Sequence, residues 1–574
     1  MKKVLQVFFL LLCYLQSHSQ CFTKAITEGN KNSDYFAGMS SDDNGNLYVI
    51  GMIYGTTVLG QNSNPQTLQN GGHFIAKYDK DLSLIWVKKM PSWSYGIATD
   101  SVGNSYITGN FCQTRTFGEG NDTITLTSYN NTWDIFVAKY DKDGNLLWAR
   151  KDGGSYIENA NAIAIDKQGN CYVTGNFYYK TVFGNNNNID SAFSIGSGGD
   201  DDHFVSAYDA NGNFKWLRTK GSQWDDMGGK AITVNNSGEI IVVADLRVPN
   251  SYLGQGRFLN ITKYDQIGTQ LFEINEEGFF IAEGNSGAYQ MGSGSLVSDK
   301  NNNIYLTGSF GNSCEFGGQT YTSTSSNSLD LFLVKYDNNG NFLKLFTIGG
   351  QGSQHGFALS TANDKVYLAG IFADNQVSLN INNIPTTFYN YGVSSGSDGM
   401  ILEFDSAFNL NSAVQIKEYN LMYMNKFIYN SQNNKFYLGG SFDFSVKLPA
   451  QSGEIILNVV PDTTQQYPSY WEDLFIAVFD PQCAVSGINE IENNSSLSVY
   501  PNPTGGNFQI NYSSSEKTKL QLNIIDSKGK TVYTETFQGD YNKAIDLGTK
   551  AKGVYFVEIV SAGKKRSVKR IVLN

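Results

Sequence analysis

Short stretches of apolar and aromatic residues recur along most of the chain, each bounded by a turn rich in Asp, Gly and Asn. Three clear copies are GNLYVIG at residues 45–51, GNSYITG at residues 103–109 and GNCYVTG at residues 169–175. Their length and their aromatic and β-branched content are typical of β-strands. Turns of the form D-x-x-G-N favour tight hairpins, because glycine readily adopts the left-handed conformation that such turns require. The pattern predicts an all-β protein.

These strands belong to a repeat of 58 to 70 residues. Its aromatic position is held in turn by Tyr48, Tyr106, Tyr172, Ile241, Tyr305, Tyr367 and Tyr437. A second element follows, KYD in its best copies, and Trp86 stands eight residues after the Tyr78 of one such element. Each repeat has room for four short strands and a long loop, and four-stranded sheets repeated radially form a β-propeller. We therefore expect a seven-bladed β-propeller of four-stranded blades over residues 20–485.

The ends of the repeat region indicate how the ring closes. The seventh copy stops at Phe479 and Asp480, before its outer strand, and the segment that begins at Cys21 matches the outer strand of the other repeats. The N-terminal segment can therefore supply the missing strand. Cys21 and Cys483 would then lie at the same closure, and we expect a disulfide between them. The pairing of the other cysteines of the mature chain stays open: Cys112, Cys171 and Cys314.

Residues 1–19 have the features of a secretory signal peptide. Lys2 and Lys3 precede a short apolar run, and small residues stand before a cleavage site that would leave Gln20 as the mature N-terminus. His18 and Gln20 occupy positions where a lipoprotein signal needs other residues, so lipidation of Cys21 is not expected. No later segment has the 18 or so uninterrupted apolar residues of a membrane span. We expect an exported protein without a transmembrane segment.

The last part of the chain differs from the repeats. A polar linker over residues 486–496 leads into a module at 497–574 with alternating stretches that predict a small Ig-like β-sandwich. Its landmarks are VYPNP at 499–503, IIDSKGK at 524–530, KGVYFV at 552–557 and KRIVL at 569–573. In these segments the characteristic positions are Pro501, Asn502, Pro503, Gly505, Gly529, Gly553, Tyr555 and Lys569.

These landmarks resemble the C-terminal sorting domain of the type IX secretion system. The resemblance implies recognition by the outer-membrane translocon, followed by removal of the domain by the associated sortase and by attachment to the cell surface or release. The protein is then secreted, and it is extracellular or attached to the outer-membrane surface. A carbohydrate-binding or adhesion sandwich is the alternative for this module. The YVTG and KYD-x-x-G-N-x-x-W signatures of the repeats in turn resemble SBBP-type bacterial β-propeller repeats.

Amino-acid composition and net charge exclude some classes of protein and some classes of binding partner. The chain has 77 aromatic residues among 574 and is only 17% charged, which excludes a disordered protein. The net charge of −11 combines +4 from residue 488 onward with −17 between residues 4 and 487. An acidic propeller without a basic stripe is not expected to bind nucleic acid.

The repeated aspartates have a structural and a chemical interpretation. DKDGN at residues 141–145 lacks the bidentate Glu of a calcium loop, so we interpret it as a turn that caps its own backbone. Five aspartates stand six residues before the Tyr or Phe of the second element, and we expect them to cap loops: Asp134, Asp202, Asp330, Asp398 and Asp473. A ligand or cation site around residues 200–203 (DDDH) is the alternative. No metal site or cofactor is predicted.

The connections between repeats carry the candidate binding residues. They contain aromatic side chains beside carboxylates, which suits a glycan or peptide ligand: Trp93, Tyr95, Tyr156, Trp224, Asp225, Asp226 and His355. Aromatic residues that pack between blades would give a similar set. We expect a non-enzymatic protein that binds a ligand or mediates adhesion. The alternative is a secreted hydrolase or lyase that acts on glycans with acidic residues of the loop face.

Overall fold

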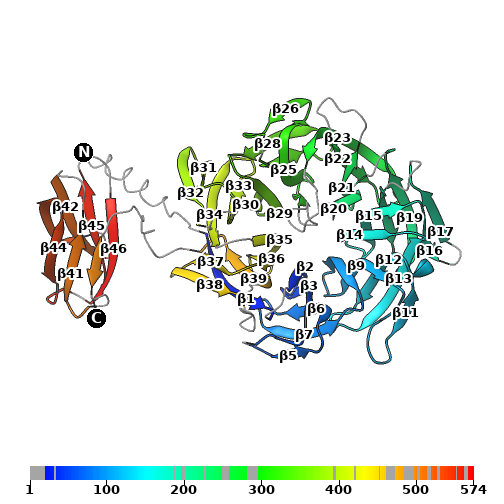
Figure 1. Cartoon of the computed structure of the whole chain (residues 1–574), viewed down its shortest axis with the longest axis horizontal. Coiled ribbons are helices and arrows are strands. Elements are labelled where there is room, and N and C mark those ends of the chain that lie inside the picture. The colour runs from blue at the N-terminus through cyan, green and yellow to red at the C-terminus, as the bar shows by residue number, and fades with distance from the viewer. Residues whose placement is uncertain are drawn as a thin grey trace, which may run out of the picture. The chain divides into compact units, whose positions relative to one another are not determined.

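The computed structural model divides the chain into two compact units, Met1–Val485 and Ser486–Asn574 (Figure 1). The predicted signal peptide (1–19) and linker (486–496) lie outside the described residues. Those residues are 20–30, 34–61, 63–185, 188–195, 201–223, 226, 228–247, 257–280, 295–326, 328–391, 396–418, 422–451, 453–459, 472–483, 497–500, 504–513, 519–526, 530–550, 552–561 and 566–573.

The described residues of the first unit form β-strands and one short 3-10 helix, η1 (Tyr129–Asn131). The strands pair in antiparallel groups of four that follow one another around a ring, a propeller-like arrangement (Figure 1). Group A contains β2 (Tyr35–Ser41), β3 (Leu47–Ile53), β6 (Gly72–Tyr78) and β7 (Leu84–Lys89). Group B contains β8 (Trp93–Thr99), β9 (Ser105–Cys112), β12 (Trp133–Tyr140) and β13 (Leu146–Gly154).

The groups that follow have the same strand order. Group C contains β14 (Glu158–Ile165), β15 (Cys171–Tyr178), β18 (Asp201–Tyr208) and β19 (Phe214–Lys220). Group D contains β20 (Gly228–Val234), β21 (Ile240–Arg247), β22 (Arg257–Tyr264) and β23 (Gln270–Phe280). Group E contains β24 (Leu296–Ser298), β25 (Ile304–Phe316), β27 (Asp330–Tyr336) and β28 (Phe342–Ile348). Group F contains β29 (Gln354–Ala362), β30 (Lys365–Phe372), β33 (Asp398–Phe404) and β34 (Leu410–Glu418).

The last group, G, joins both ends of the unit. It contains β35 (Met422–Asn430), β36 (Lys435–Phe442), β39 (Asp473–Asp480) and the N-terminal strand β1 (Cys21–Glu28). Strand β1 pairs antiparallel with β39, from Cys21 opposite Asp480 to Glu28 opposite Leu474. Cys21 and Cys483 form a disulfide beside this pairing. The N-terminal segment thus occupies the outer-strand position that the seventh repeat lacks.

Extra strands lie between the second and third strands of the groups, in segments that the sequence marked only as long loops. They are β4 (Thr57–Leu59) with β5 (Gln66–Leu68), β10 (Thr114–Phe117) with β11 (Ile124–Thr127), β16 (Lys180–Asn185) with β17 (Asn188–Phe193), β26 (Gln319–Thr322) beside β25, β31 (Gln376–Ile381) with β32 (Ile384–Tyr389), and β37 (Ser445–Ala450) with β38 (Gly453–Asn458). Strand β16 also pairs with β13, and β37 with β34, so these hairpins tie neighbouring groups together.

The repeated turns carry their own hydrogen bonds. In the turn after β12, the Asp141 carboxylate accepts the backbone N–H of Asp143 and of Asn145 at 2.9 Å each, and the Asn145 side-chain amide at 3.0 Å. Gly144 has a φ of 82°, where a β-carbon would be strained. Both carboxylate oxygens of Asp141 therefore accept hydrogen bonds within the turn, as expected for a self-capping hairpin.

Where they occur, the KYD and Trp residues of the repeat join one group to the next. Trp148 of group B donates its indole N–H to the carbonyl of Ala210 in group C at 3.1 Å, and the Lys139 ammonium donates to the same carbonyl at 3.4 Å. Lys139 also lies over the ring of Tyr106 at 4.6 Å. Trp86 and Lys77 make the equivalent bonds from group A to Lys142 O in group B. These repeated residues therefore have a structural role.

The apolar core lies between neighbouring groups. One cluster joins Tyr48 and Ile75 of group A to Ile107 and Phe136 of group B, all completely buried. Similar clusters occur at other junctions around the ring. Because each group buries its faces against both neighbours, no group is expected to fold alone.

The second unit has two antiparallel sheets. One contains β40 (Ser498–Tyr500), β41 (Asn507–Tyr512) and β44 (Tyr541–Asp546); the other contains β42 (Lys519–Asp526), β43 (Thr531–Gln538), β45 (Gly553–Ser561) and β46 (Arg566–Leu573). Phe508 and Ile510 of the first sheet and Leu522 and Val557 of the second share one buried core. Tyr555 is buried, Gly505 and Gly553 are exposed, and Lys569 is partly exposed. Pro501, Asn502, Pro503 and Gly529 lie outside the described residues.

Candidate functional site

The ends of the paired strands define two faces of the ring. Trp93 at the start of β8 pairs with Asn110 near the end of β9, whereas the tight turn between these strands lies at their other ends. We call the face with the starts of the first strands and the ends of the second strands the loop face. It carries the connections between groups, where the sequence predicted the binding residues.

Trp93 and Tyr95 project from the first strand of group B. Tyr95 is the extra residue of a β-bulge between Ser94 and Gly96, and the contact between the two rings shows that both side chains lie on the same side of the strand. Their rings are stacked at 6.3 Å, and Trp93 also lies 4.7 Å from the ring of His73 in group A. Trp93 is 40% exposed and Tyr95 is 37% exposed. Burial lowers the pKa of His73 to about 4, so this neighbour is uncharged at neutral pH.

Tyr156 forms a second aromatic pair on the loop face, at the entry to group C. Its ring stacks on that of Tyr179 at 4.3 Å with an interplanar angle of 27°. Both side chains are more than 40% exposed. Tyr179 directly follows β15 and has a φ of 51°, a left-handed conformation that is rare for an aromatic residue. The close stacking accompanies this conformation.

A third pair, Tyr35 and Tyr54 of group A, was not among the sequence candidates. The ring centroids are 6.4 Å apart, edge to face, and both side chains are more than 40% exposed. Tyr35 pairs with Met52, directly after Gly51, just as Trp93 pairs with Asn110, directly after Gly109. This repeat register is the signal that could have identified Tyr35. We call the rings of Tyr35, Tyr54, Trp93, Tyr95, Tyr156 and Tyr179 the aromatic arc.

His355 holds the same register position in group F, but it lies inside the protein. It pairs with Ile371, directly after Gly370, and is only 3% exposed. Its Nδ1 lies 2.9 Å from the Ser309 hydroxyl oxygen, and burial lowers its pKa to about 4. His355 is therefore not part of the aromatic arc.

Asp226 is also buried, at 1% exposure. Its carboxylate accepts the backbone N–H of Ser222 at 2.7 Å and the Ser222 hydroxyl at 2.9 Å. These bonds close the connection into group D rather than facing solvent. Trp224 and Asp225 lie outside the described residues.

The aspartates at the starts of the third strands cap the loops before them. Asp134 accepts the backbone N–H of Tyr129 at 2.8 Å, Asp202 that of Ile195 at 2.8 Å, and Asp330 that of Thr324 at 2.8 Å. Next to Asp202, His203 is buried, and desolvation lowers its pKa to about 3. Within the described part of the chain, no three His, Cys, Asp or Glu side chains are placed to hold a metal ion.

Glu158, two residues after Tyr156, is completely buried. Desolvation raises the pKa of its carboxyl group to about 9. Glu158 is therefore protonated at neutral pH and cannot act as a carboxylate toward a ligand on the loop face. A buried acid of this kind has no direct access to a substrate.

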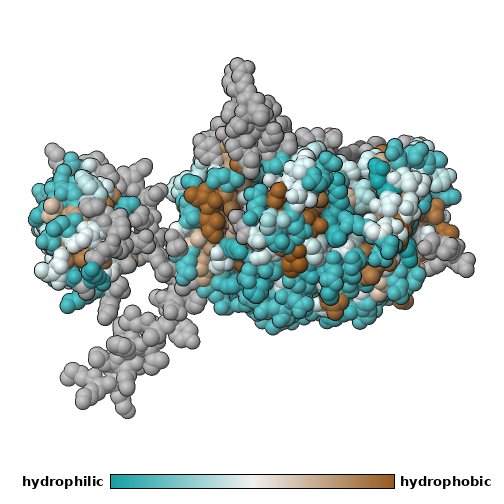
Figure 2. Space-filling view, turned by 90° about the horizontal axis from the view of Figure 1, so that it is seen from below, coloured by the Kyte–Doolittle hydropathy of each residue, from teal (hydrophilic) through white to brown (hydrophobic). Residues whose placement is uncertain are grey.

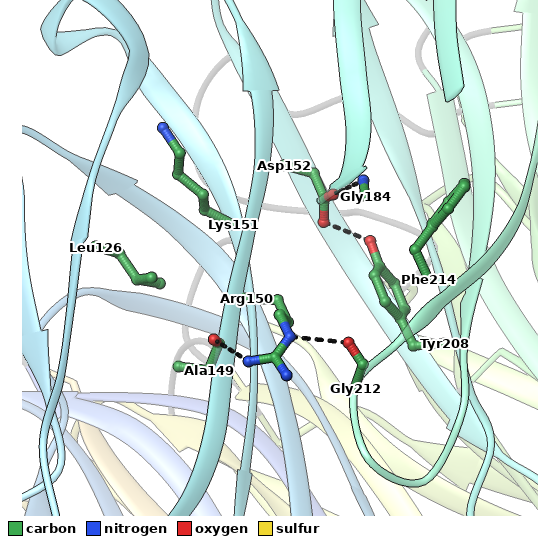
Figure 3. A pocket seen from close by; sticks show the side chains of 9 residues that line it. All are labelled: Leu126, Ala149, Arg150, Lys151, Asp152, Gly184, Tyr208, Gly212 and Phe214. Atoms are coloured by element: carbon green, nitrogen blue, oxygen red, sulfur yellow. Dashed lines mark hydrogen bonds between the residues drawn. The ribbon is translucent and has the colours of Figure 1, made fainter. Parts of the chain in front are cut away.

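A cavity of about 230 Å³ lies at the junction of groups B and C, and none of its lining residues belongs to the aromatic arc (Figure 3). In it the Asp152 carboxylate accepts the Tyr208 hydroxyl and the backbone N–H of Gly184, the latter at 2.7 Å. The Arg150 guanidinium donates to the carbonyls of Gly212 and Ala149 at 2.9 and 3.0 Å. Burial raises the pKa of Asp152 to about 6. These polar side chains form hydrogen bonds between groups B and C. We therefore interpret the cavity as part of the structural contact between them.

The face of the first unit that Figure 2 shows is mainly hydrophilic. In the view of Figure 2, apolar residues form separate patches among hydrophilic ones rather than a continuous band. Among the helices of the described residues, none is long and apolar enough to cross a membrane.

Comparison with known proteins identifies the second unit. Residues 498–574 match the family model of the secretion system C-terminal sorting domain. This match indicates secretion through the type IX system, to the cell surface or the medium. It also implies an interaction of this tail with the type IX secretion machinery.

Among curated proteins, the chain is similar to a viral repeat protein. An uncharacterized WD repeat-containing protein of Acanthamoeba polyphaga mimivirus is 30% identical over 141 residues, which are 24% of this chain and 10% of that protein. The chain thus spans about a tenth of the length of the curated relative that it matches.

Solved structures with a similar course of the chain are equally remote. Phage phi92 endosialidase is 8% identical with a TM-score of 0.36, over 96% of this chain and 88% of that one. Drosophila Plexin A, in complex with Semaphorin 1b, is 9% identical with a TM-score of 0.32, over 74% and 86%. A protein of unknown function from Bacteroides caccae is 10% identical with a TM-score of 0.27, over 57% and 94%.

Proposed function

We propose that this protein is a non-enzymatic binding or adhesion protein that works outside the cell and holds its ligand on the loop face. The aromatic arc is the observation that carries this proposal. Soluble proteins usually bury such rings, and exposed aromatic side chains gathered on one face mark a binding surface. Trp and Tyr supply large contact areas that lose little side-chain entropy on binding.

The proposed architecture is a seven-bladed β-propeller followed by an Ig-like sandwich. Groups A to G would be the blades, with β1 as the outer strand of the last blade. SBBP-type repeats would account for the recurring KYD and Trp residues. Residues 1–19 would direct the chain to the periplasm, and the tail would then engage the translocon and the sortase.

The carboxylates near the loop face favour binding over catalysis. A glycan hydrolase or lyase needs acidic or basic groups that touch the substrate. Asp226 and Glu158 are buried, and Asp226 is hydrogen-bonded to its own loop. The exposed groups of the aromatic arc are phenol and indole rings, which can hold a ligand by stacking.

A glycan and peptide array with the exported protein tests this proposal. We expect binding to a subset of ligands that is lost in Trp93→Ala and kept in Tyr389→Ala. Tyr389 is a suitable control because it is 56% exposed but lies on β32, outside the aromatic arc. Turnover of a bound ligand would refute the non-enzymatic function, and binding that is unaffected by Trp93→Ala would refute the site.

A further inference from the structure

The carboxyl groups that neighbour the aromatic arc in sequence are buried instead of exposed at its surface. Asp34 precedes Tyr35 and is completely buried, where it accepts the backbone N–H groups of Tyr54 at 2.8 Å and of Asn30 at 2.7 Å. Burial raises the pKa of Asp34 to about 7. Glu158, after Tyr156, is buried and protonated. The acids next to these rings in sequence are thus withdrawn from the surface.

The burial of these acids limits the chemistry of the ligand. A cationic peptide needs exposed carboxylates for specific ion pairs, and the acids beside the arc are buried. An anionic polymer is repelled by a chain segment of net charge −17 between residues 4 and 487. The ligand that fits has flat apolar faces for stacking and hydroxyl groups instead of charges. Pyranose rings of neutral sugars have this combination.

The arrangement of the rings also favours a chain over a single sugar. The three pairs belong to groups A, B and C, which are consecutive in the ring, and their first strands β2, β8 and β14 pack side by side. Aromatic pairs on three neighbouring groups offer several stacking positions, and successive contacts along one chain raise the affinity without new chemistry.

From these observations we propose that the aromatic arc binds a neutral polysaccharide, with successive sugar units of one chain stacked on the rings of groups A, B and C. This inference rests on the proposed binding function and names its ligand class. Because stacking and neutral hydrogen bonds dominate, binding should depend little on ionic strength.

Affinity electrophoresis of the exported protein tests the ligand class. Native gels would contain one of four neutral polymers (laminarin, hydroxyethyl cellulose, mannan or soluble starch) or one of two anionic polymers (alginate or polygalacturonate). We expect at least one neutral polymer to retard the protein equally in 50 and 500 mM NaCl. No retardation by the anionic polymers is expected.

Variants connect the retardation to the rings. Trp93→Ala and Tyr156→Ala should each lower the affinity for the polymer, as determined from the retardation, about 5- to 30-fold, since one aromatic contact is removed. Tyr389→Ala, which lies outside the aromatic arc, should bind like the wild type. With neutral oligosaccharides, the affinity should rise from the disaccharide to the hexasaccharide by at least tenfold in calorimetric titration.

The outcomes separate the ligand class from the binding function. If only the anionic polymers, or a peptide from the array, bind in a way that Trp93→Ala abolishes, the neutral polysaccharide is wrong and the binding site stands. Equal affinity for the disaccharide and the hexasaccharide would overturn the extended ligand. If no probe binds in a way that depends on the arc, both this inference and the proposed function are refuted.

Discussion

The disulfide between Cys21 and Cys483 fastens the strand that completes the ring, so its removal should weaken the first unit. The appropriate perturbation is the double substitution Cys21→Ser and Cys483→Ser. Both sulfur atoms are inside the protein, and serine is close to cysteine in size. Strand β1 keeps its backbone pairing with β39 in this variant, so the loss isolates the covalent link.

The magnitude follows from the length of chain that the disulfide closes. The two cysteines are 462 residues apart in sequence. Loop-closure entropy for a segment of this length corresponds to about 6 kcal/mol at 25 °C, while measured disulfides mostly contribute about 2–4 kcal/mol. With a denaturant dependence of about 3 kcal/mol per molar urea, a loss of 3 kcal/mol lowers the unfolding midpoint by about 1 M.

Urea unfolding followed by tryptophan fluorescence measures this loss, and limited trypsin digestion locates it. Lys24 lies in β1, so release of this strand should expose the bond after Lys24 to trypsin before the rest of the ring is cut. Cys112→Ser is the matched control, since Cys112 is a free, partly exposed cysteine. An unchanged midpoint together with no early cleavage at Lys24 would show that the disulfide does not fasten β1.

Three further predictions concern the junctions, pH and export. Trp148→Phe removes the indole bond to Ala210 O and should lower stability by about 1–2 kcal/mol in urea unfolding; an unchanged midpoint would contradict the role of this Trp in joining groups B and C. Burial raises the pKa of Glu28 to about 7, so the folded protein binds this proton more tightly than the unfolded chain, and stability falls as the pH rises from about 4 to 7. The urea midpoint should therefore be lower at pH 8 than at pH 5, and by a smaller margin in Glu28→Gln; equal margins would contradict it. Deletion of residues 496–574 should abolish appearance in the medium or on the cell surface, as measured by immunoblotting of cell fractions, and continued export would refute the sorting role of the tail.

Much of the ring could be predicted because its information is local and repeated. A turn such as residues 141–145 places an Asp, a Gly and an Asn at positions where each makes a contact within the turn itself. The match between the segment at Cys21 and the outer strand of other repeats also depends only on the repeat register. The hairpins within the long loops lack a repeated sequence, so the same method predicted loops there.

The binding surface was less predictable, because exposure depends on contacts between distant residues. Trp93 and His355 hold the same register position, yet Trp93 is exposed and His355 is buried beside Ser309. Asp226 is in a connection rich in polar residues, but its carboxylate closes that connection. Sequence alone gave the types of residue and the face, whereas packing determines which of these side chains a ligand can reach.

Neighbouring groups contact each other through one recurring pair of positions, and the residues at these two positions differ from junction to junction. At three junctions a buried carboxylate near the end of one outer strand accepts the hydroxyl of a Tyr in the third strand of the next group: Glu28 with Tyr78, Asp152 with Tyr208, and Glu276 with Tyr336. At two others both partners are apolar and share a core cluster: Ile348 with Phe404, and Ile416 with Phe479.

The pairs thus change together, because a buried carboxylate without the hydroxyl, or a hydroxyl without the acid, would lack a hydrogen bond. Two junctions depart from this rule: Lys220 holds the position of the acid at the junction from group C to group D, and the junction from group A to group B lacks the acid as well. Met90 stands where the acid would be, and the buried Tyr140 hydroxyl has no hydrogen-bond partner among the described residues. Tyr140→Phe should therefore be neutral or slightly stabilising, whereas Tyr208→Phe should destabilise, since it leaves the buried Asp152 carboxylate with one bond fewer. Equal effects of the two substitutions on the urea midpoint would refute this pairing rule.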